Sequence, residues 1–112
     1  MQTQEMEYHG ETYEIHCGRN AQGNNELLTQ AAPDDVWFHI DGMSSAHVIL
    51  VNKGSVSLRK IPKQVIKRAA CICKASVKAS GTVTIIYTQC KNVEKTDIIG
   101  MVIPHNVKNI RV

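Results

Sequence analysis

The sequence has few aromatic residues and few residues that break regular structure. Its 112 residues include one Trp, one Phe, three Tyr and three Pro. No apolar run approaches the roughly 20 residues that a membrane-spanning helix needs. The first residues are acidic and polar, unlike a signal peptide. We therefore expect one folded domain without a membrane span, located in the cytoplasm, with the nucleus as the alternative.

Motifs for catalysis and for metal binding are also missing. There is no G-x-S-x-G elbow or glycine-rich oxyanion loop, although Asp41, Ser44 and His47 lie close in sequence. The four Cys and five His form no C-x-x-C or H-x-x-x-H pair, and Cys71 and Cys73 on a helix would point about 200° apart. We expect no enzyme, no metal and no cofactor, with a hydrolase or a zinc site as the weaker alternatives.

Acidic residues are scarce in the second part of the chain. Residues 1–41 contain eight of the ten acidic residues and a single basic one, Arg19. Residues 42–112 contain the other twelve basic residues and only two acidic ones. This asymmetry favours a basic face directed at a polyanion. The alternative is that the two halves neutralise each other in the folded protein.

A lysine stripe is predicted on a long helix. Pro62 suits the first turn of a helix and Gly81 suits the position after its end, so we predict a helix over residues 62–80. Four lysines fall within a sector of about 60° on this helix, opposite its apolar face: Lys63, Lys67, Lys74 and Lys78. No Asp or Glu lies on the helix to pair with them. The stripe is predicted to meet an anionic partner, and a plain solvated face is the alternative.

The only Trp and the only Phe lie in a predicted strand. Apolar and polar residues alternate over residues 36–41, so Phe38 should enter the core while Trp37 and His39 share an accessible face. The chain can reverse after Asp41, and a second strand is expected from His47 to residue 51. The alternatives are that Trp37 is a partly buried structural residue and that the two histidines bond to each other or to the backbone.

The remaining elements complete an α+β domain with a mostly antiparallel sheet, one long amphipathic helix and one short helix. We expect strands at 12–17 and 83–89, a short helix capped by Asn24 or Asn25 that ends near Ala32, a lysine-bearing loop at 90–97, and a hairpin of 101–104 with 107–112. Residues 1–10 are expected to form a loose terminus before the domain of residues 11–112.

Several separated motifs occur together along the chain. They are Asp35, Trp37-Phe38-His39, His47-Val48-Ile49, Gly18-Arg19-Asn20 with Asn25, Leu28 and Thr29, Gly100-x-Val102, and Lys108-x-Ile110-x-Val112. In this combination they resemble the NFACT-R domain, the RNA-binding module at the C-terminal side of the Rqc2, NEMF and fibronectin-binding-like proteins. Several motifs in the right order are more specific than one short pattern.

Three further segments narrow the resemblance: Ser44-Ser45-Ala46-His47, Ile61-Pro62-Lys63 and Lys95-Thr96. They are similar to the coiled-coil domain-containing protein 25 branch of this family, a stand-alone form of the domain. The sequence contains neither the coiled coil usual in that branch nor the other parts of the long proteins. Tail synthesis on stalled ribosomes is therefore not carried over to this chain.

The resemblance implies a non-catalytic nucleic-acid-binding module. Its expected partner is structured RNA, such as transfer or ribosomal RNA, in translation or ribosome quality control, with association to the ribosome or a translation factor. The alternative is an adaptor that docks on an acidic protein or an anionic surface through the same basic face.

Each candidate residue has an expected role in binding. Trp37 or His39 would stack on an unpaired base, and serines and His47 would donate hydrogen bonds to phosphate or 2′-hydroxyl groups, while lysines neutralise phosphates. The candidate site comprises Arg19, Asn20, Trp37, His39, Ser44, Ser45, His47, Lys63, Lys67, Lys74, Lys78, Lys91, Lys95 and Lys108.

Overall fold

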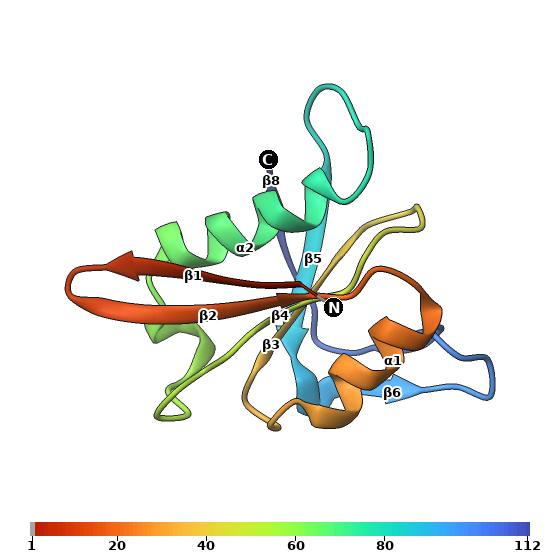
Figure 1. The fold of residues 1–112 in the computed structure, drawn as a ribbon, viewed down its shortest axis with the longest axis horizontal. Helices are drawn as coiled ribbons and strands as arrows, with labels where there is room; N and C mark the ends of the chain where they lie inside the picture. The colour runs from red at the N-terminus through yellow and green to blue at the C-terminus, as the bar shows by residue number, and fades with distance from the viewer. Residues whose placement is uncertain (1) are drawn as a thin grey trace.

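The computed structural model describes residues 2–112, which form two antiparallel sheets and two α-helices (Figure 1). The elements in chain order are β1 (Gln2–Tyr8), β2 (Glu11–Cys17), α1 (Ala21–Gln30), β3 (Val36–Ile40), β4 (Val48–Leu50), a 3-10 turn (Leu58–Lys60), α2 (Lys63–Ala75), β5 (Thr84–Gln89), a second 3-10 turn (Cys90–Asn92), β6 (Val93–Lys95), β7 (Val102–Pro104) and β8 (Lys108–Arg111). Over this part of the chain no helix is long and apolar enough to span a membrane.

Six strands form the main sheet in the order β1-β2-β4-β3-β5-β8, and β6 pairs with β7 in a small second sheet. Every pairing is antiparallel. The central strand β3 aligns Phe38 with Val48 on one side and with Tyr87 on the other. The predicted α+β class with a long and a short helix is therefore confirmed.

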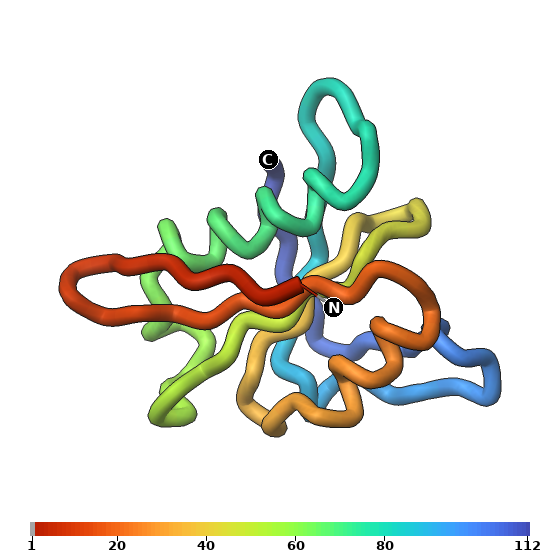
Figure 2. The backbone as a smooth tube through the Cα atoms, in the orientation of Figure 1, coloured from red at the N-terminus to blue at the C-terminus, as the bar shows by residue number. Residues whose placement is uncertain are grey.

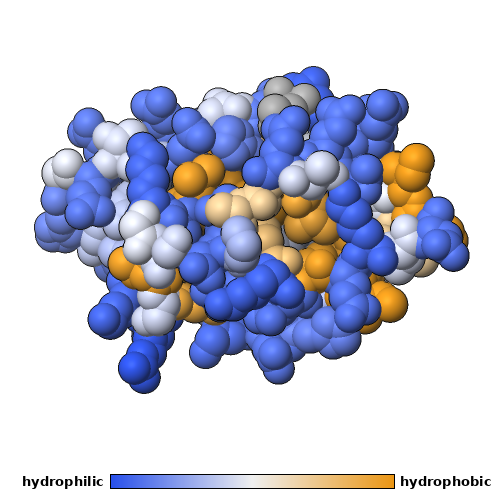
Figure 3. Space-filling view, turned by 90° about the horizontal axis from the view of Figure 1, so that it is seen from below, coloured by the Kyte–Doolittle hydropathy of each residue, from blue (hydrophilic) through white to orange (hydrophobic). Residues whose placement is uncertain are grey.

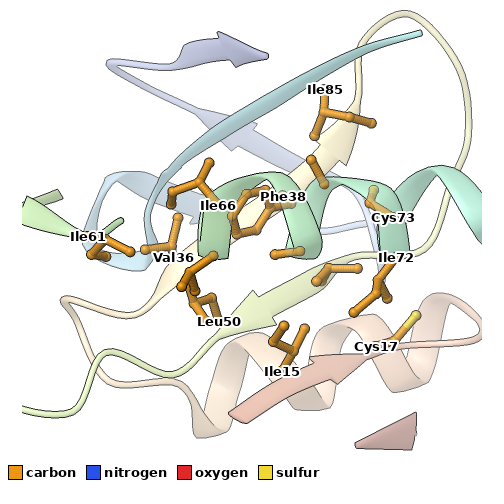
Figure 4. Close-up of a cluster of buried hydrophobic side chains, with 14 of the residues drawn as sticks. Ile15, Cys17, Val36, Phe38, Leu50, Ile61, Ile66, Ile72, Cys73 and Ile85 are labelled. Atoms are coloured by element: carbon orange, nitrogen blue, oxygen red, sulfur yellow. The ribbon is translucent and has the colours of Figure 1, made fainter. Parts of the chain in front are cut away.

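Helix α2 covers one face of the main sheet and forms the larger core (Figure 4). Phe38 is fully buried there and stacks on Tyr87 with ring centroids 5.5 Å apart, as the strand period predicted for its core position. Burying a large apolar side chain stabilises a fold by about 1.5–3 kcal/mol. The members contributed by α2 are Val65, Ile66, Ala69, Ala70, Ile72 and Cys73.

A smaller core lies on the opposite face of the sheet, because alternate residues of each strand point to opposite sides. Trp37 and Ile49 pack there against Leu27 of α1 and Cys90, with Val93 of β6 beside them. Trp37 is only 1% exposed. The face that was predicted to be accessible is thus covered by α1 and the small sheet at Trp37, which has no exposed surface to stack on a base. His39 on the same face is only partly buried.

The N-terminal residues form a long hairpin that extends away from the rest of the molecule (Figures 1 and 2). Strand β1 pairs with β2 over its whole length, and the turn at His9 and Gly10 has positive φ angles of 49° and 80°, which hairpin turns require. The Tyr8 hydroxyl donates to Oε1 of Gln64 on α2 at 3.1 Å. Residues 2–8, which were expected to be a loose terminus, therefore form a paired strand in this structure, and Met1 lies outside the described residues.

Both helices begin or end at other residues than predicted. Helix α1 is capped by Asn20, whose Oδ1 accepts a hydrogen bond from Gly23 N at 2.8 Å, and not by Asn24 or Asn25. Helix α2 ends at Ala75, and both the backbone N and the hydroxyl of Ser76 donate to Cys73 O, the hydroxyl at 2.6 Å. Lys78 consequently lies beyond the helix.

The predicted C-terminal hairpin is also wrong. Strand β7 pairs with β6, inside the segment expected to be a loop, while β8 pairs with β5 of the main sheet. Three hydrogen bonds hold the connection between β7 and β8. His105 N donates to Asn92 O at 2.8 Å, and the buried Thr88 hydroxyl bonds to His105 O at 3.0 Å and to Asn106 O at 3.3 Å. The last strands therefore belong to different sheets.

Candidate nucleic-acid interface

His47 is fixed at the start of β4 by three hydrogen bonds. Its backbone N donates to Oδ1 of the buried Asn24 at 3.0 Å, and its carbonyl accepts from Gly18 N at 2.9 Å. Its ring atom Nδ1 accepts from the indole Nε1 of Trp37 at 3.1 Å. The two backbone bonds tie His47 to α1 and to the loop before it, and the ring bond ties it to β3.

The bond from Trp37 also sets the protonation of the His47 ring. An indole N–H can only donate, so Nδ1 carries no proton and the neutral ring holds its proton on Nε2. Burial, with a smaller contribution from His39, lowers the pKa of His47 from 6.5 to about 4. Within residues 2–112 Nε2 has no hydrogen-bond partner. Every fully buried side-chain N or O atom in that range does have a partner, so Nε2 cannot be one of the fully buried atoms. Nε2 is therefore an N–H donor with access to solvent.

His39 lies between the accessible space and Trp37. Its ring is parallel to the indole with centroids 5.7 Å apart, and it meets the His47 ring edge-on at 5.2 Å. Burial lowers the pKa of His39, while a backbone hydrogen bond at Ile40 and the charge of Asp41 oppose that shift. Both histidines are thus predominantly neutral at pH 7.

A cavity of about 740 Å³ opens over these rings. Seven of the predicted site residues line it: Arg19, Asn20, Trp37, His39, Ser44, Ser45 and His47. Its other wall is apolar and was not predicted from the sequence. That wall includes Met43, Ile98, Ile99 and Met101, four of the large hydrophobic side chains that stay exposed.

The apolar wall belongs mainly to the loop between β6 and β7. Gly100 in this loop has φ +85°, and a Cβ at this position would lie 2.8 Å from Cβ of Ala21. Only glycine allows the loop to approach α1 so closely. Figure 3 shows hydrophobic residues gathered at the end of the molecule where Figure 1 places this loop. The sequence signal for this wall is the apolar run Ile98-Ile99-Gly100-Met101. This run begins just after the predicted lysine-bearing loop of residues 90–97, and no role in a site was predicted for it.

A second cavity, of about 540 Å³, continues from the first toward α2. The two cavities share Arg19, Ala46 and Ser76 in their linings. The second also contains Arg68 of α2, an exposed residue that does not belong to the predicted lysine stripe. Two guanidinium groups therefore border one continuous surface, from α2 to the histidine pair.

The sequence and the fold now decide the family. The pattern of the family described as NFACT protein RNA binding domain matches residues 5–108. The chain belongs to this family. The resemblance recognised in its motifs is thereby confirmed for nearly the whole chain.

The relatives of this NFACT domain include coiled-coil domain-containing protein 25. The mouse protein is 34% identical over 106 residues, which are 90% of this chain and 51% of the relative. The Dictyostelium discoideum homologue is 30% identical over 104 residues, 88% of this chain and 50% of the relative. The chain thus spans about half the length of these curated relatives.

A solved structure shows the same fold. The C-terminal part of the fibronectin/fibrinogen-binding protein from Streptococcus suis superimposes with a TM-score of 0.81 and 24% sequence identity. The match covers 96% of this chain and 43% of that one. The α+β arrangement of this NFACT domain therefore occurs in a distant bacterial protein.

Two polar residues of the NFACT domain's predicted site hold the backbone. The Ser45 hydroxyl accepts from Ile40 N at 3.1 Å and donates to Ala46 O at 3.1 Å, which closes the turn between β3 and β4. Asn20 uses its Oδ1 to cap α1. Ser44 is exposed, and its hydroxyl bonds to none of residues 2–112. No hydrogen bond in this range joins either serine to His47, unlike a hydrolytic site.

The lysines of α2 do not behave alike. Lys63 and Lys67 are exposed, and neither has a carboxylate within 4 Å among the described residues. The two halves of the chain therefore do not neutralise each other by ion pairs at this helix. Lys74 is half-buried, and its Nζ donates to Gly81 O at 2.6 Å and to Val112 O at 3.2 Å. Because its ammonium group bonds to these two backbone carbonyls, Lys74 does not belong to an exposed lysine stripe with Lys63 and Lys67.

The remaining predicted lysines are divided between the two faces of the sheet. Lys108 precedes the core residue Ile110 by two positions on β8, which puts it on the α2 side. Lys91 pairs with Asp34 at 3.0 Å, and Lys95 on β6 bonds to Thr29 of α1. Lys91 and Lys95 thus lie beside α1 and the small sheet, while Lys63, Lys67 and Lys108 lie on the α2 side. The predicted lysines therefore do not share a single surface.

Proposed function

We propose that this NFACT domain is a non-catalytic module that binds structured RNA, such as transfer or ribosomal RNA. Its family of RNA-binding domains supports a nucleic-acid partner. The same proposal includes a role in translation or ribosome quality control, in the cytoplasm or the nucleus. It also includes association with the ribosome or a translation factor.

The observation that carries the proposal is the set of unpaired cations along α2. Lys63, Lys67 and Arg68 project from a helix without acidic residues, and Arg19 extends this charge across the second cavity. Like charges on successive turns repel one another when no anion lies between them. Phosphate groups of RNA would relieve this repulsion and release counterions into solution.

Other features favour binding over catalysis. Burial raises the pKa of the Cys73 thiol to about 11 and that of Cys90 to about 12, so neither is a thiolate nucleophile at pH 7. His47 gives Nδ1 to Trp37 and bonds to no serine in residues 2–112. The side chains that reach the cavity can hold a ligand, which is what an RNA-binding module requires.

The test is a salt titration of RNA binding with two double variants that remove the same charge. The first variant, Lys63→Ala with Lys67→Ala, removes two unpaired cations from α2. The control variant, Lys91→Ala with Lys95→Ala, removes two cations that already bond to Asp34 and Thr29 beside α1 and the small sheet. Each lost phosphate contact should reduce the slope of log affinity against log salt by roughly 0.7–0.9. We expect the α2 variant to lose about 1.4–1.8 of slope and the control variant to lose less than half of that.

The ligand comparison separates RNA from a general polyanion. A transfer RNA and a DNA duplex of equal length should be titrated at physiological salt, and the RNA should bind more tightly because only it offers loops and 2′-hydroxyl groups. Equal affinity for both, with equal losses in the two double variants, would overturn the RNA proposal. That result would instead favour an adaptor that docks on acidic proteins or anionic surfaces.

A further inference from the structure

The cavity over the histidines has walls unsuited to a phosphate. Ile98 and Ile99 are each 61% exposed, and Met43 and Met101 are about half exposed. All four line the same cavity. An exposed group of large apolar side chains beside polar residues marks a binding groove more often than plain surface. The occupant of this groove must therefore present apolar faces.

The polar part of the cavity offers a neutral hydrogen-bond donor. His47 has its proton on Nε2, which reaches the cavity, and burial keeps both His47 and His39 uncharged at pH 7. An uncharged N–H group binds a carbonyl oxygen or a ring nitrogen without needing a charge on the ligand. The inner end of the cavity thus fits a neutral group with acceptors along one edge.

The cations lie at the rim and not inside. Arg19 stands where the two cavities meet, and Arg68 lines the second cavity only. Neither guanidinium has a carboxylate within 4 Å among residues 2–112. Because arginine binds phosphate oxygens through two parallel N–H groups, this rim fits a phosphate next to the buried group.

We propose that the cavity receives one unpaired base of the bound RNA, with an acceptor edge toward His47 Nε2 and the adjoining phosphate at Arg19 and Arg68. The faces of the base would contact Met43 and the loop of Ile98 and Ile99. The volume of about 740 Å³ lies within the roughly 300–1,000 Å³ of small-molecule sites. This inference rests on the proposed RNA-binding function and names its contact beyond the phosphates.

The test uses an RNA hairpin with a single-stranded loop and a set of the same hairpins that each lack one loop base. Two neutral variants are compared: Ile98→Gln with Ile99→Gln alters the cavity wall, whereas Ile103→Gln alters an exposed isoleucine on β7 that does not line it. The native domain should lose about tenfold or more in affinity when one particular base is missing, as expected for a group removed from a fitted pocket.

The variant with Ile98→Gln and Ile99→Gln should bind the intact hairpin about as weakly as the native domain binds the hairpin that lacks the critical base. Removal of that base should not weaken RNA binding by the variant any further. Ile103→Gln should behave as the native domain does. The loss should be the same at every salt concentration, because a neutral contact releases no counterions.

The outcomes separate this inference from the function on which it rests. If every hairpin binds equally well and the cavity variant binds as the native domain does, while the α2 lysines still set the salt slope, the base site is overturned and RNA binding stands. Tight binding of an apolar peptide that competes with RNA at the cavity, with no dependence on any loop base, would likewise overturn it. Absence of RNA binding altogether would overturn both.

Discussion

The indole Nε1 of Trp37 donates to Nδ1 of His47 at 3.1 Å, so the largest buried side chain of the domain sets the proton position of the ring above it. Residues ten positions apart in the chain thereby join β3 to the start of β4. Of the polar ring atoms of this pair, only Nε2 of His47 remains free to donate within residues 2–112. In the proposed site, one hydrogen bond of the fold therefore sets which donor a ligand would meet.

The low pKa of His47 predicts that acid destabilises the domain. The folded protein holds His47 with a pKa of about 4, and the unfolded chain returns it to about 6.5. Between these values the unfolded state binds the additional proton, so this contribution to stability is complete above pH 6.5 and is lost as the pH falls toward 4. The free energy of unfolding should fall by about 3 kcal/mol over this range from His47, and His39 adds in the same direction.

Two measurements check this pH dependence. NMR titration should place the midpoint of His47 below pH 5, and His47→Gln should flatten the fall in unfolding free energy between pH 6.5 and 4. A midpoint near 6.5 would contradict the buried, neutral imidazole.

The second prediction concerns the indole N–H of Trp37, which donates to His47. Trp37→Phe should lower the free energy of unfolding by about 1–3 kcal/mol, because Nδ1 of the buried His47 loses its partner and the smaller ring leaves part of its buried site unfilled. Tyr87→Phe is the matched control, since the Tyr87 hydroxyl bonds to none of residues 2–112 and the ring stacking on Phe38 is kept. Denaturant unfolding of both variants measures the difference, and equal losses would show that the indole N–H carries no weight.

Lys74 and Lys67 are predicted to have opposite effects although both belong to α2. Lys74→Met removes the donor to Gly81 O and Val112 O and should cost about 1 kcal/mol of unfolding free energy, with little loss of RNA affinity. Lys67→Met should weaken RNA binding and leave thermal unfolding unchanged, because its ammonium group is exposed and unpaired. The account is contradicted if Lys74→Met proves the more damaging to RNA binding at unchanged stability.

Gly100 is predicted to position the apolar wall of the cavity. Gly100→Ala places a methyl group against Ala21 and strains a φ of +85°, whereas Gly54→Ala at φ +88° meets no atom within 4 Å. Both changes carry a similar backbone cost of about 1 kcal/mol. Only Gly100→Ala should also shift the backbone NMR signals of residues 98–101 and Ala21. Identical behaviour of the two variants would mean that the contact with α1 does not hold the loop.

The sequence predicted the elements with clear periodicity. The burial of Phe38 followed from the alternation of apolar and polar residues in β3, and the exposure of Lys63 and Lys67 followed from the helical repeat of α2. The family motifs also predicted the group of residues that lines the cavity around His47. These features are local, so a short stretch of chain contains the information for them.

The remaining features depended on contacts between distant segments. Trp37 alternates as an exposed residue would, but α1 and the small sheet cover its side of β3. Lys74 matches the stripe by periodicity, yet its partners are carbonyls that lie seven and 38 positions further along the chain. The pairing of β8 with β5 instead of β7 likewise joins residues far apart in sequence. Periodicity gives the direction of a side chain but not what covers it.

Photo-crosslinking tests the central claim most directly, namely that RNA lies along α2 with a base over the histidines. A transfer RNA containing 4-thiouridine should be irradiated with the native domain, and the crosslinked peptides identified by mass spectrometry. We predict crosslinks in residues 41–47 and 98–101, with protection of Lys63 and Lys67 from acylation in the same complex. Crosslinks confined to β1 and β2, or to the face of Lys91 and Lys95, would contradict the account.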